Sequence, residues 1–181
     1  KSLAFGGIND HLTITHNCFV NGHYGVYLYN YGTIDEVYID DNQFINQRYG
    51  AMDLPFMSNL YIRRNTISSN SSNSYKGIDL SSSFQTTDVS GNIINLPNLA
   101  DGMFLNSMNY GSAIGTAQVY NNMVQSTGNG NGIRIWNSEN TLIAYNSCNM
   151  SGGGYAFELT GGDSVTVHNN IFVSNSGRAF S

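Results

Sequence analysis

Two aspartates, Asp53 and Asp79, occupy the same position in two copies of a short sequence pattern in which apolar residues alternate with others. The copies read AMDL (51–54) and GIDL (77–80). This alternation predicts strands whose apolar side chains point inward, so that both carboxylates point outward. If the strands pair in register, the carboxylates lie roughly 5 Å apart. Like charges at that distance raise the pKa of one carboxyl, which predicts a pair that shares a proton.

A proton-sharing pair suits two kinds of chemistry, and the sequence leaves both open. One is acid–base hydrolysis of a glycosidic bond by Asp53 and Asp79. The other is a Ca²⁺ site formed by the same two residues, because that ion prefers hard oxygen ligands. A third interpretation, in which both are only solvated strand residues, stays open as well.

The alternating pattern recurs at 25–28, 102–105, 132–135 and 156–159, and the outward positions of all the copies form two columns. The first column contains Tyr27, Asp53, Asp79, Phe104, Arg134 and Glu158, and the second contains Tyr29, Pro55, Ser81, Asn106, Trp136 and Thr160. Only 10% of the residues in the chain are charged, so this face is unusually rich in charge. Carboxylates, an arginine and aromatic rings are what a polysaccharide groove requires, because sugars offer hydroxyls and apolar ring faces.

We therefore predict a polysaccharide groove along this face. The predicted catalytic residues are Asp53, Asp79, Lys76, Arg134 and Glu158. The predicted substrate-binding residues are Tyr27, Tyr29, Phe104, Asn106 and Trp136. The plainer alternative is that these positions are polar or aromatic because such residues suit strand surfaces.

The register of these strands is set by seven asparagines that recur at intervals of 23 to 30 residues. They are Asn17, Asn42, Asn65, Asn92, Asn122, Asn146 and Asn170. A repeat of this length predicts one structural unit stacked on copies of itself. Apolar residues alternate before each asparagine, and another apolar residue follows two positions later, so each coil has at least two short strands and we expect three.

The asparagines themselves are expected to be structural. A tight bend between parallel sheets often needs a left-handed backbone, which asparagine tolerates, so we expect them to adopt it. Stacked amides can also bond to one another and to backbone groups in the turns. The predicted fold is an all-β, right-handed parallel β-helix of about seven coils with an inward asparagine ladder. A leucine-rich repeat fits less well, because the second half of each repeat alternates as a strand.

Composition excludes several classes of function. The net charge of −5 and the pI near 5.1 argue against a nucleic-acid partner. No apolar run reaches about 18 residues, so we expect no membrane span. Cys18 and Cys148 lie in the first and sixth repeats, too far apart for a disulfide, and should be free thiols. A lateral ion pair between Asp40 and Arg63 is expected on the first strand of the coil, whereas the histidines show no metal-ligand spacing.

The chain resembles the right-handed parallel β-helix repeats of the pectate-lyase-like superfamily. The resemblance is carried by VYIDDNQF, LYIRRNTI and VTVHNNIF, each an asparagine-ladder segment of the repeat, and covers essentially the whole chain. It implies a ligand groove along one sheet face. In the lyase version it also implies that Ca²⁺ neutralises a uronate carboxyl while Lys76 or Arg134 removes the neighbouring proton.

The leading hypothesis is a secreted β-helix protein that binds, and processes as a lyase or glycoside hydrolase, an acidic or neutral polysaccharide. The alternative is a non-enzymatic adhesion or stalk module at the cell surface. We expect an extracellular or cell-surface monomer and one domain over residues 1–181. Because the chain starts without methionine and stops inside a repeat, we also expect it to be a segment of a longer protein.

Overall fold

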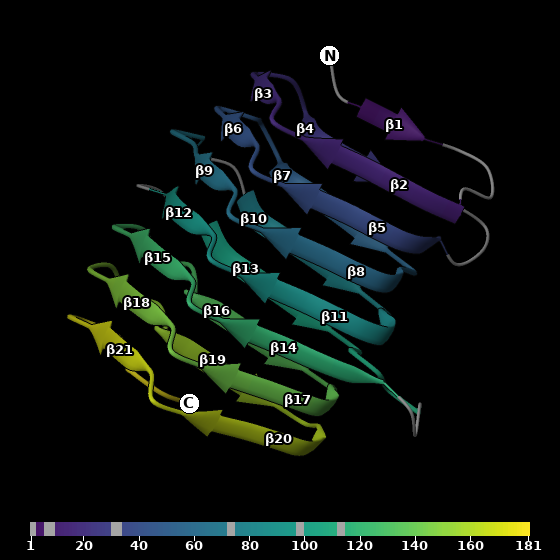
Figure 1. The fold of residues 1–181 in the computed structure, drawn as a ribbon. Helices are drawn as coiled ribbons and strands as arrows, with labels where there is room; N and C mark the ends of the chain where they lie inside the picture. The colour runs from purple at the N-terminus through teal and green to yellow at the C-terminus, as the bar shows by residue number, and fades with distance from the viewer. Residues whose placement is uncertain (1–2, 6–9, 30–33, 72–74, 97–99, 112–114) are drawn as a thin grey trace.

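The computed structural model describes residues 3–5, 10–29, 34–71, 75–96, 100–111 and 115–181. Three parallel sheets of seven strands each run the length of the molecule (Figure 1). Sheet A contains β1 (Leu3–Phe5), β4 (Tyr24–Leu28), β7 (Gly50–Pro55), β10 (Tyr75–Ser81), β13 (Ala100–Asn106), β16 (Ile133–Trp136) and β19 (Phe157–Thr160). Sheet B contains β2 (Asp10–Thr15), β5 (Asp35–Asp40), β8 (Ser58–Arg63), β11 (Phe84–Ser90), β14 (Thr116–Tyr120), β17 (Glu139–Ala144) and β20 (Asp163–His168). Sheet C contains β3 (Cys18–Val20), β6 (Gln43–Ile45), β9 (Thr66–Ser68), β12 (Ile93–Leu96), β15 (Met123–Ser126), β18 (Ser147–Met150) and β21 (Ile171–Ser174).

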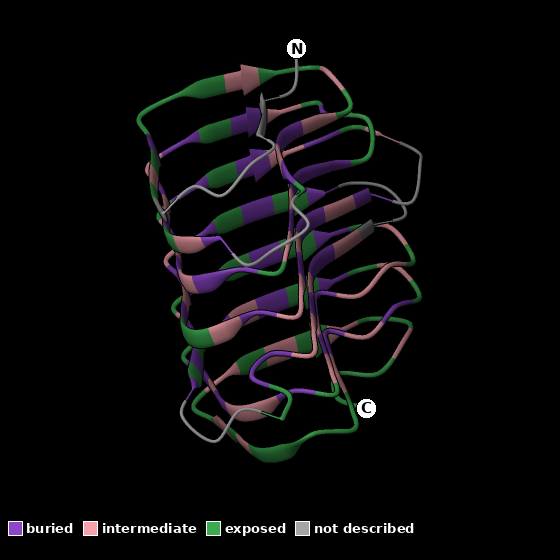
Figure 2. Cartoon of the chain, turned by 90° about the vertical axis from the view of Figure 1, so that its right-hand side faces the viewer, coloured by how far each residue is buried: buried purple, intermediate pink, exposed green. Residues whose placement is uncertain are grey.

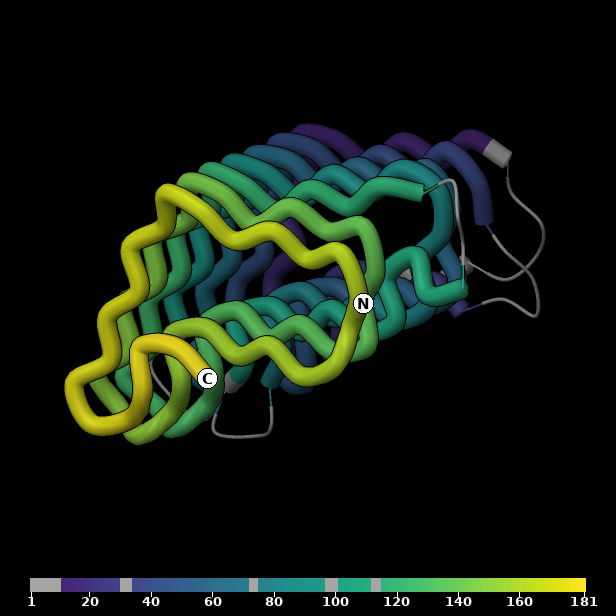
Figure 3. Tube along the Cα trace, turned by 90° about the horizontal axis from the view of Figure 1, so that it is seen from below, coloured from purple at the N-terminus to yellow at the C-terminus, as the bar shows by residue number. Residues whose placement is uncertain are grey.

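The chain visits the three sheets in the same order in every coil, so each strand pairs with its counterpart one coil away. Figure 3 views the solenoid from its C-terminal end, where the chain turns anticlockwise as it approaches the viewer, so the coil is right-handed. All strand pairs are parallel, and the described ranges contain no helix. The predicted β-helix is therefore confirmed, and the leucine-rich repeat is excluded.

Apolar side chains fill the interior in columns that run along the axis. One column of sheet B consists of Ile14, Ile39, Ile62, Val89, Val119, Ile143 and Val167. Figure 2 shows buried residues along the strands of the middle coils. Cys148 occupies the inward column of sheet C between Val124 and Phe172, and burial raises the pKa of its thiol to about 12. Both cysteines are free thiols, as expected.

The seven asparagines form a continuous hydrogen-bonded ladder at the corner between sheets B and C. The Nδ2 of Asn65 donates to the Oδ1 of Asn92 at 3.0 Å, and the Nδ2 of Asn92 donates to the Oδ1 of Asn122 at 3.0 Å. Asn92 also donates to the carbonyl oxygen of Ile62 at 2.9 Å. The ladder thus satisfies buried backbone groups at the bend, which confirms its structural role.

The expectation that the ladder residues adopt the left-handed backbone is wrong. The residue immediately before each of them does so instead, with φ between 54° and 63°. These residues are His16, Asp41, Arg64, Gly91, Asn121, Tyr145 and Asn169. The reason is geometric, because the asparagine must point inward to stack. The bend is made one position earlier, by a residue whose side chain is at least partly exposed.

Candidate functional site

The outward face of sheet A brings together the residues that the sequence predicts for one site. Asp53 on β7 pairs directly with Asp79 on β10, and Tyr27 on β4 pairs with Asp53. Beyond Asp79 the same column continues through Phe104, Arg134 and Glu158. The second column runs through Pro55, Ser81, Asn106, Trp136 and Thr160. The first column, and the second from Pro55 to Thr160, are therefore present in the expected register, whereas Tyr29 lies one residue beyond the end of β4.

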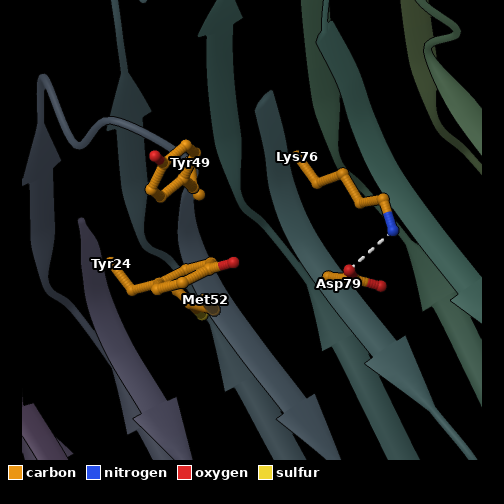
Figure 4. Close-up of a pocket in the computed structure, with 6 residues that line it drawn as sticks. Tyr24, Tyr49, Met52, Lys76 and Asp79 are labelled. Atoms are coloured by element: carbon orange, nitrogen blue, oxygen red, sulfur yellow. Dashed lines mark hydrogen bonds and ion pairs between the residues drawn. The ribbon is translucent and has the colours of Figure 1, made fainter. Parts of the chain in front are cut away.

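Asp53 and Asp79 have different electrostatic surroundings although they lie side by side. Burial, reinforced by the charge of Asp79, raises the pKa of Asp53 from 3.8 to about 6, while Lys76 opposes that rise. The Nζ of Lys76 lies 2.7 Å from the Oδ2 of Asp79, on the same strand (Figure 4). Asp53 therefore holds a proton more readily than a free aspartate does, and the ammonium of Lys76 lies on the neighbouring carboxylate.

A cavity of about 190 Å³ opens beside the aspartate pair (Figure 4). It exists because the outward position between Tyr24 and Lys76 is occupied by Gly50, which has no side chain. Tyr24 and Tyr49 form its aromatic wall, and Lys76 and Asp79 form its charged wall. Sequence reasoning missed both tyrosines. For Tyr24 the available signal was its position before Gly25, which matches that of Lys76 before Gly77 in the repeat. Tyr49 lies one residue before the matching position, which Gly50 occupies.

Arg134 is held away from the aspartate pair by two carboxylates. Its Nε lies 2.7 Å from Glu158, and its NH1 lies 3.5 Å from Asp101, a residue that sequence reasoning also missed. The guanidinium sits 4.3 Å from the ring centroid of Trp136 and 5.6 Å from that of Phe104. The structure thus divides the predicted catalytic residues into an aspartate–lysine group and an arginine–glutamate group, with Phe104 between them.

Three polar side-chain atoms on this face are buried without a hydrogen-bond partner. They are the Oδ1 of Asp79, the indole Nε1 of Trp136 and the Nε of Arg134, which lies 2.7 Å from Glu158 as an ion pair. Buried polar groups are nearly always hydrogen-bonded, so such atoms call for a water or a ligand. At the N-terminal end of the face, the rings of Tyr27 and Tyr29 are parallel within 2° at 6.2 Å. The face therefore combines unsatisfied polar groups with aromatic platforms.

A scan against protein-family models matches residues 7–180 to the family described as periplasmic copper-binding protein (NosD). The chain belongs to the NosD family. Searches of curated proteins and of solved structures gave no match. Membership of the NosD family agrees with the repeat architecture but does not test the resemblance to the pectate-lyase-like superfamily, which stays a prediction.

The structure gives no support to the predicted Ca²⁺ site of this NosD-family chain. Within the described ranges, no three or more histidine, cysteine, aspartate or glutamate side chains are arranged to hold a metal ion together. Asp53 and Asp79 supply only two carboxylates, and Lys76 is already paired with Asp79 at 2.7 Å. Oxygen ligands for Ca²⁺ number six to eight, so the pair alone is a poor site.

Two ion pairs between neighbouring coils lie along sheet B and are structural. Arg63 donates to both carboxylate oxygens of Asp40, from Nε at 3.1 Å and from NH2 at 2.7 Å, which confirms the predicted lateral pair. Arg64 forms the same bidentate hydrogen bonds with Asp41, at 2.9 and 2.8 Å.

Among the described residues of the NosD-family chain, no helix has the length and apolar character of a membrane span.

Proposed function

We propose that this NosD-family chain binds a polysaccharide along the outward face of sheet A, and that Asp53 and Asp79 hydrolyse it. The observation that carries the proposal is the pairing of these carboxyls in register on a face where Asp79 Oδ1 and Trp136 Nε1 lack partners. Sugar rings would lie against Phe104, Trp136 and the tyrosines. Glu158, Arg134 and Asn106 would bind the substrate farther along the face.

The asymmetry of the aspartate pair supports hydrolysis over elimination. A carboxyl with a pKa of about 6 is suited to donate a proton to the glycosidic oxygen, and Asp79 on the adjacent strand is placed to attack the sugar. Adjacent strands lie about 4.8 Å apart, close to the carboxyl separation of glycosidases that retain configuration. Lyase chemistry would need Lys76 or Arg134 as the base, and both are engaged by carboxylates.

The family description also bears on location and on metal. We extend its word periplasmic to this chain, which agrees with a glycan-binding protein outside the cytoplasm. The description also mentions copper, but the described residues contain no group of three or more histidine, cysteine, aspartate or glutamate side chains that could hold a metal ion. Three of the four imidazoles lie in the first coil and His168 in the last, while His11 pairs with Glu36 at 2.8 Å. The two thiols are likewise separated, in β3 and β18. We therefore assign copper no role in the proposed reaction.

The proposal is tested by combining glycan binding with product analysis. Trp136 is the only tryptophan of the chain, so its fluorescence reports directly on the face. We expect one or more of a panel of uronate and neutral polysaccharides to change this fluorescence, and new reducing ends to appear without an unsaturated product. Asp53→Asn and Asp79→Asn should abolish cleavage and retain binding. The matched control is Asp163→Asn, which alters an exposed aspartate on sheet B.

Each outcome of that experiment is informative. Binding without cleavage in the unaltered protein would favour the adhesion or stalk alternative. An unsaturated uronate product would replace hydrolysis by elimination. No change in Trp136 fluorescence and no retention by any glycan of the panel would remove the groove altogether.

A further inference from the structure

A second hollow lies on the outward face of sheet B, away from the aspartate pair. It crosses β14, β17 and β20 and has a volume of about 160 Å³. Its lining consists of Gln118, Tyr120, Leu142, Ala144, Tyr145 and His168. None of these residues belongs to the face of sheet A, so the hollow has no place in the proposed hydrolysis.

The hollow arises because one position in a column of outward side chains holds only a small residue. Ala144 stands between Tyr120 and His168 on three adjacent strands, and it contributes only a methyl group. Two strand spacings separate the flanking residues by about 9.6 Å. Elsewhere on sheet B, Tyr38 and Tyr61 lie on adjacent strands and stack with ring centroids 4.7 Å apart. The gap above Ala144 is therefore one ring thick.

Tyr145 closes one side of this gap at a cost in backbone energy. It is 57% exposed and has a φ of 57°, a backbone conformation that is unfavourable for a residue with a Cβ. The equivalent position holds asparagine in the preceding and following coils, Asn121 and Asn169, where the same backbone is tolerated. The Tyr145 ring meets the imidazole of His168 edge-on, at 5.6 Å and 83°.

The lining is apolar at its base and polar at its rim. Ala144 and Leu142 provide the base, and the Gln118 amide, the Tyr120 hydroxyl and the His168 imidazole provide the rim. The Tyr120 hydroxyl also donates a hydrogen bond to the Oδ2 of Asp88, at 3.3 Å. A ring with apolar faces and hydroxyls on its edge matches this arrangement, because its faces meet aromatic rings while its edge meets hydrogen-bonding groups.

We propose that this hollow is a binding site for one pyranose unit of a neutral sugar, separate from the face of sheet A. A purely aromatic ring would fill the gap but leave the three rim groups without new partners. A strongly charged ligand would find no fixed opposite charge among the lining residues. The site would let the solenoid hold a glycan on two of its three faces.

The test is residue-resolved NMR titration with the neutral disaccharides cellobiose and maltose, at concentrations in the millimolar range. We expect at least one of them to shift the side-chain amide of Gln118 and the ring signals of His168. Ala144→Tyr supplies the missing ring from the chain itself, so it should weaken binding at least about tenfold, a difference of about 1.4 kcal/mol. The matched control is Asn149→Tyr, which adds the same ring to an exposed position on sheet C and should leave binding unchanged.

A second variant keeps the proposal testable if Ala144→Tyr fails to fold. Tyr145→Asn introduces the residue that the neighbouring coils carry at the same turn, so it should fold and yet bind the disaccharide more weakly. The double variant Asp53→Asn/Asp79→Asn should leave these shifts intact, which separates the site from the proposed hydrolytic centre. Absence of shifts at Gln118 and His168 with both sugars, or undiminished shifts in Ala144→Tyr, would overturn the proposal. Shifts produced by phenol instead of the sugars would overturn the assignment to a sugar.

Discussion

Asp53 lies directly opposite Asp79 on the neighbouring strand, yet only Asp79 has a cation on it, the Nζ of Lys76 at 2.7 Å. Two identical side chains thereby have different electrostatic surroundings. Burial, reinforced by the charge of Asp79, raises the pKa of Asp53, and Lys76 opposes that rise. Such a division of roles between two carboxyls is what acid–base chemistry needs.

The raised pKa of Asp53 makes folding stability depend on pH in a predictable direction. Between the unfolded value of 3.8 and the folded value of about 6, the folded state binds more protons. The contribution of Asp53 is therefore fully present below 3.8 and is lost as the pH rises through about 6. We expect Asp53→Asn to remove this loss, making the variant more stable than the parent by about 2 kcal/mol at alkaline pH and by little in acid.

Urea unfolding of both proteins below pH 3.8 and at about pH 8 measures this difference. Asp163→Asn, on the exposed end of sheet B, serves as the control for a general effect of net charge. A stability difference that is equal at the two pH values would show that Asp53 is not protonated in the folded state.

Lys76 is expected to tune the aspartate pair without being needed for the fold. Its charge lowers the pKa of Asp53, so Lys76→Met should raise that pKa further above 6. Carbon-detected NMR titration of the Asp53 carboxyl would follow the change directly. As a control, Arg64→Gln removes a cation that pairs with Asp41 beside sheet B, and it should leave the titration midpoint of Asp53 unchanged. A lower titration midpoint of Asp53 in the Lys76→Met variant would contradict the effect that we assign to Lys76 on this pKa.

Much of this architecture follows from the sequence because the repeat supplies its own alignment. The period placed Asp53 beside Asp79 and Arg134 beside Glu158, and the structure confirms both pairings. The pattern could not show that Gly50 leaves a cavity, nor that Asp101 engages Arg134, because both residues lie outside the two columns that alternation defines. It also misplaced the left-handed residue by one position, since tolerance of that backbone does not say which residue of the bend must face inward.

The interior of the asparagine ladder is expected to be far more sensitive than its end. Asn92 is fully buried and bonds on both sides, so Asn92→Ala would leave the backbone N–H and Nδ2 of Asn65 without their acceptor. We expect a loss of about 3 kcal/mol or more. Asn17→Ala, at the exposed first rung, should cost about 1 kcal/mol. Thermal or urea unfolding of the two variants decides the matter, and equal losses would mean that the rungs do not act through buried hydrogen bonds.

The left-handed turn before each rung offers a stabilising substitution. Tyr145 adopts a φ of 57°, whereas Asn121 and Asn169 occupy the same turn with a φ of 54° each. Asparagine tolerates this conformation better than an aromatic residue, so Tyr145→Asn should stabilise the fold by about 0.5–1 kcal/mol, after loss of the ring contact with His168. The reverse exchange, Asn121→Tyr, should destabilise it by a similar amount, as measured by urea unfolding. If Tyr145→Asn instead lowers stability, the contact between Tyr145 and His168 outweighs the strain, and the tyrosine is explained by packing rather than by a ligand.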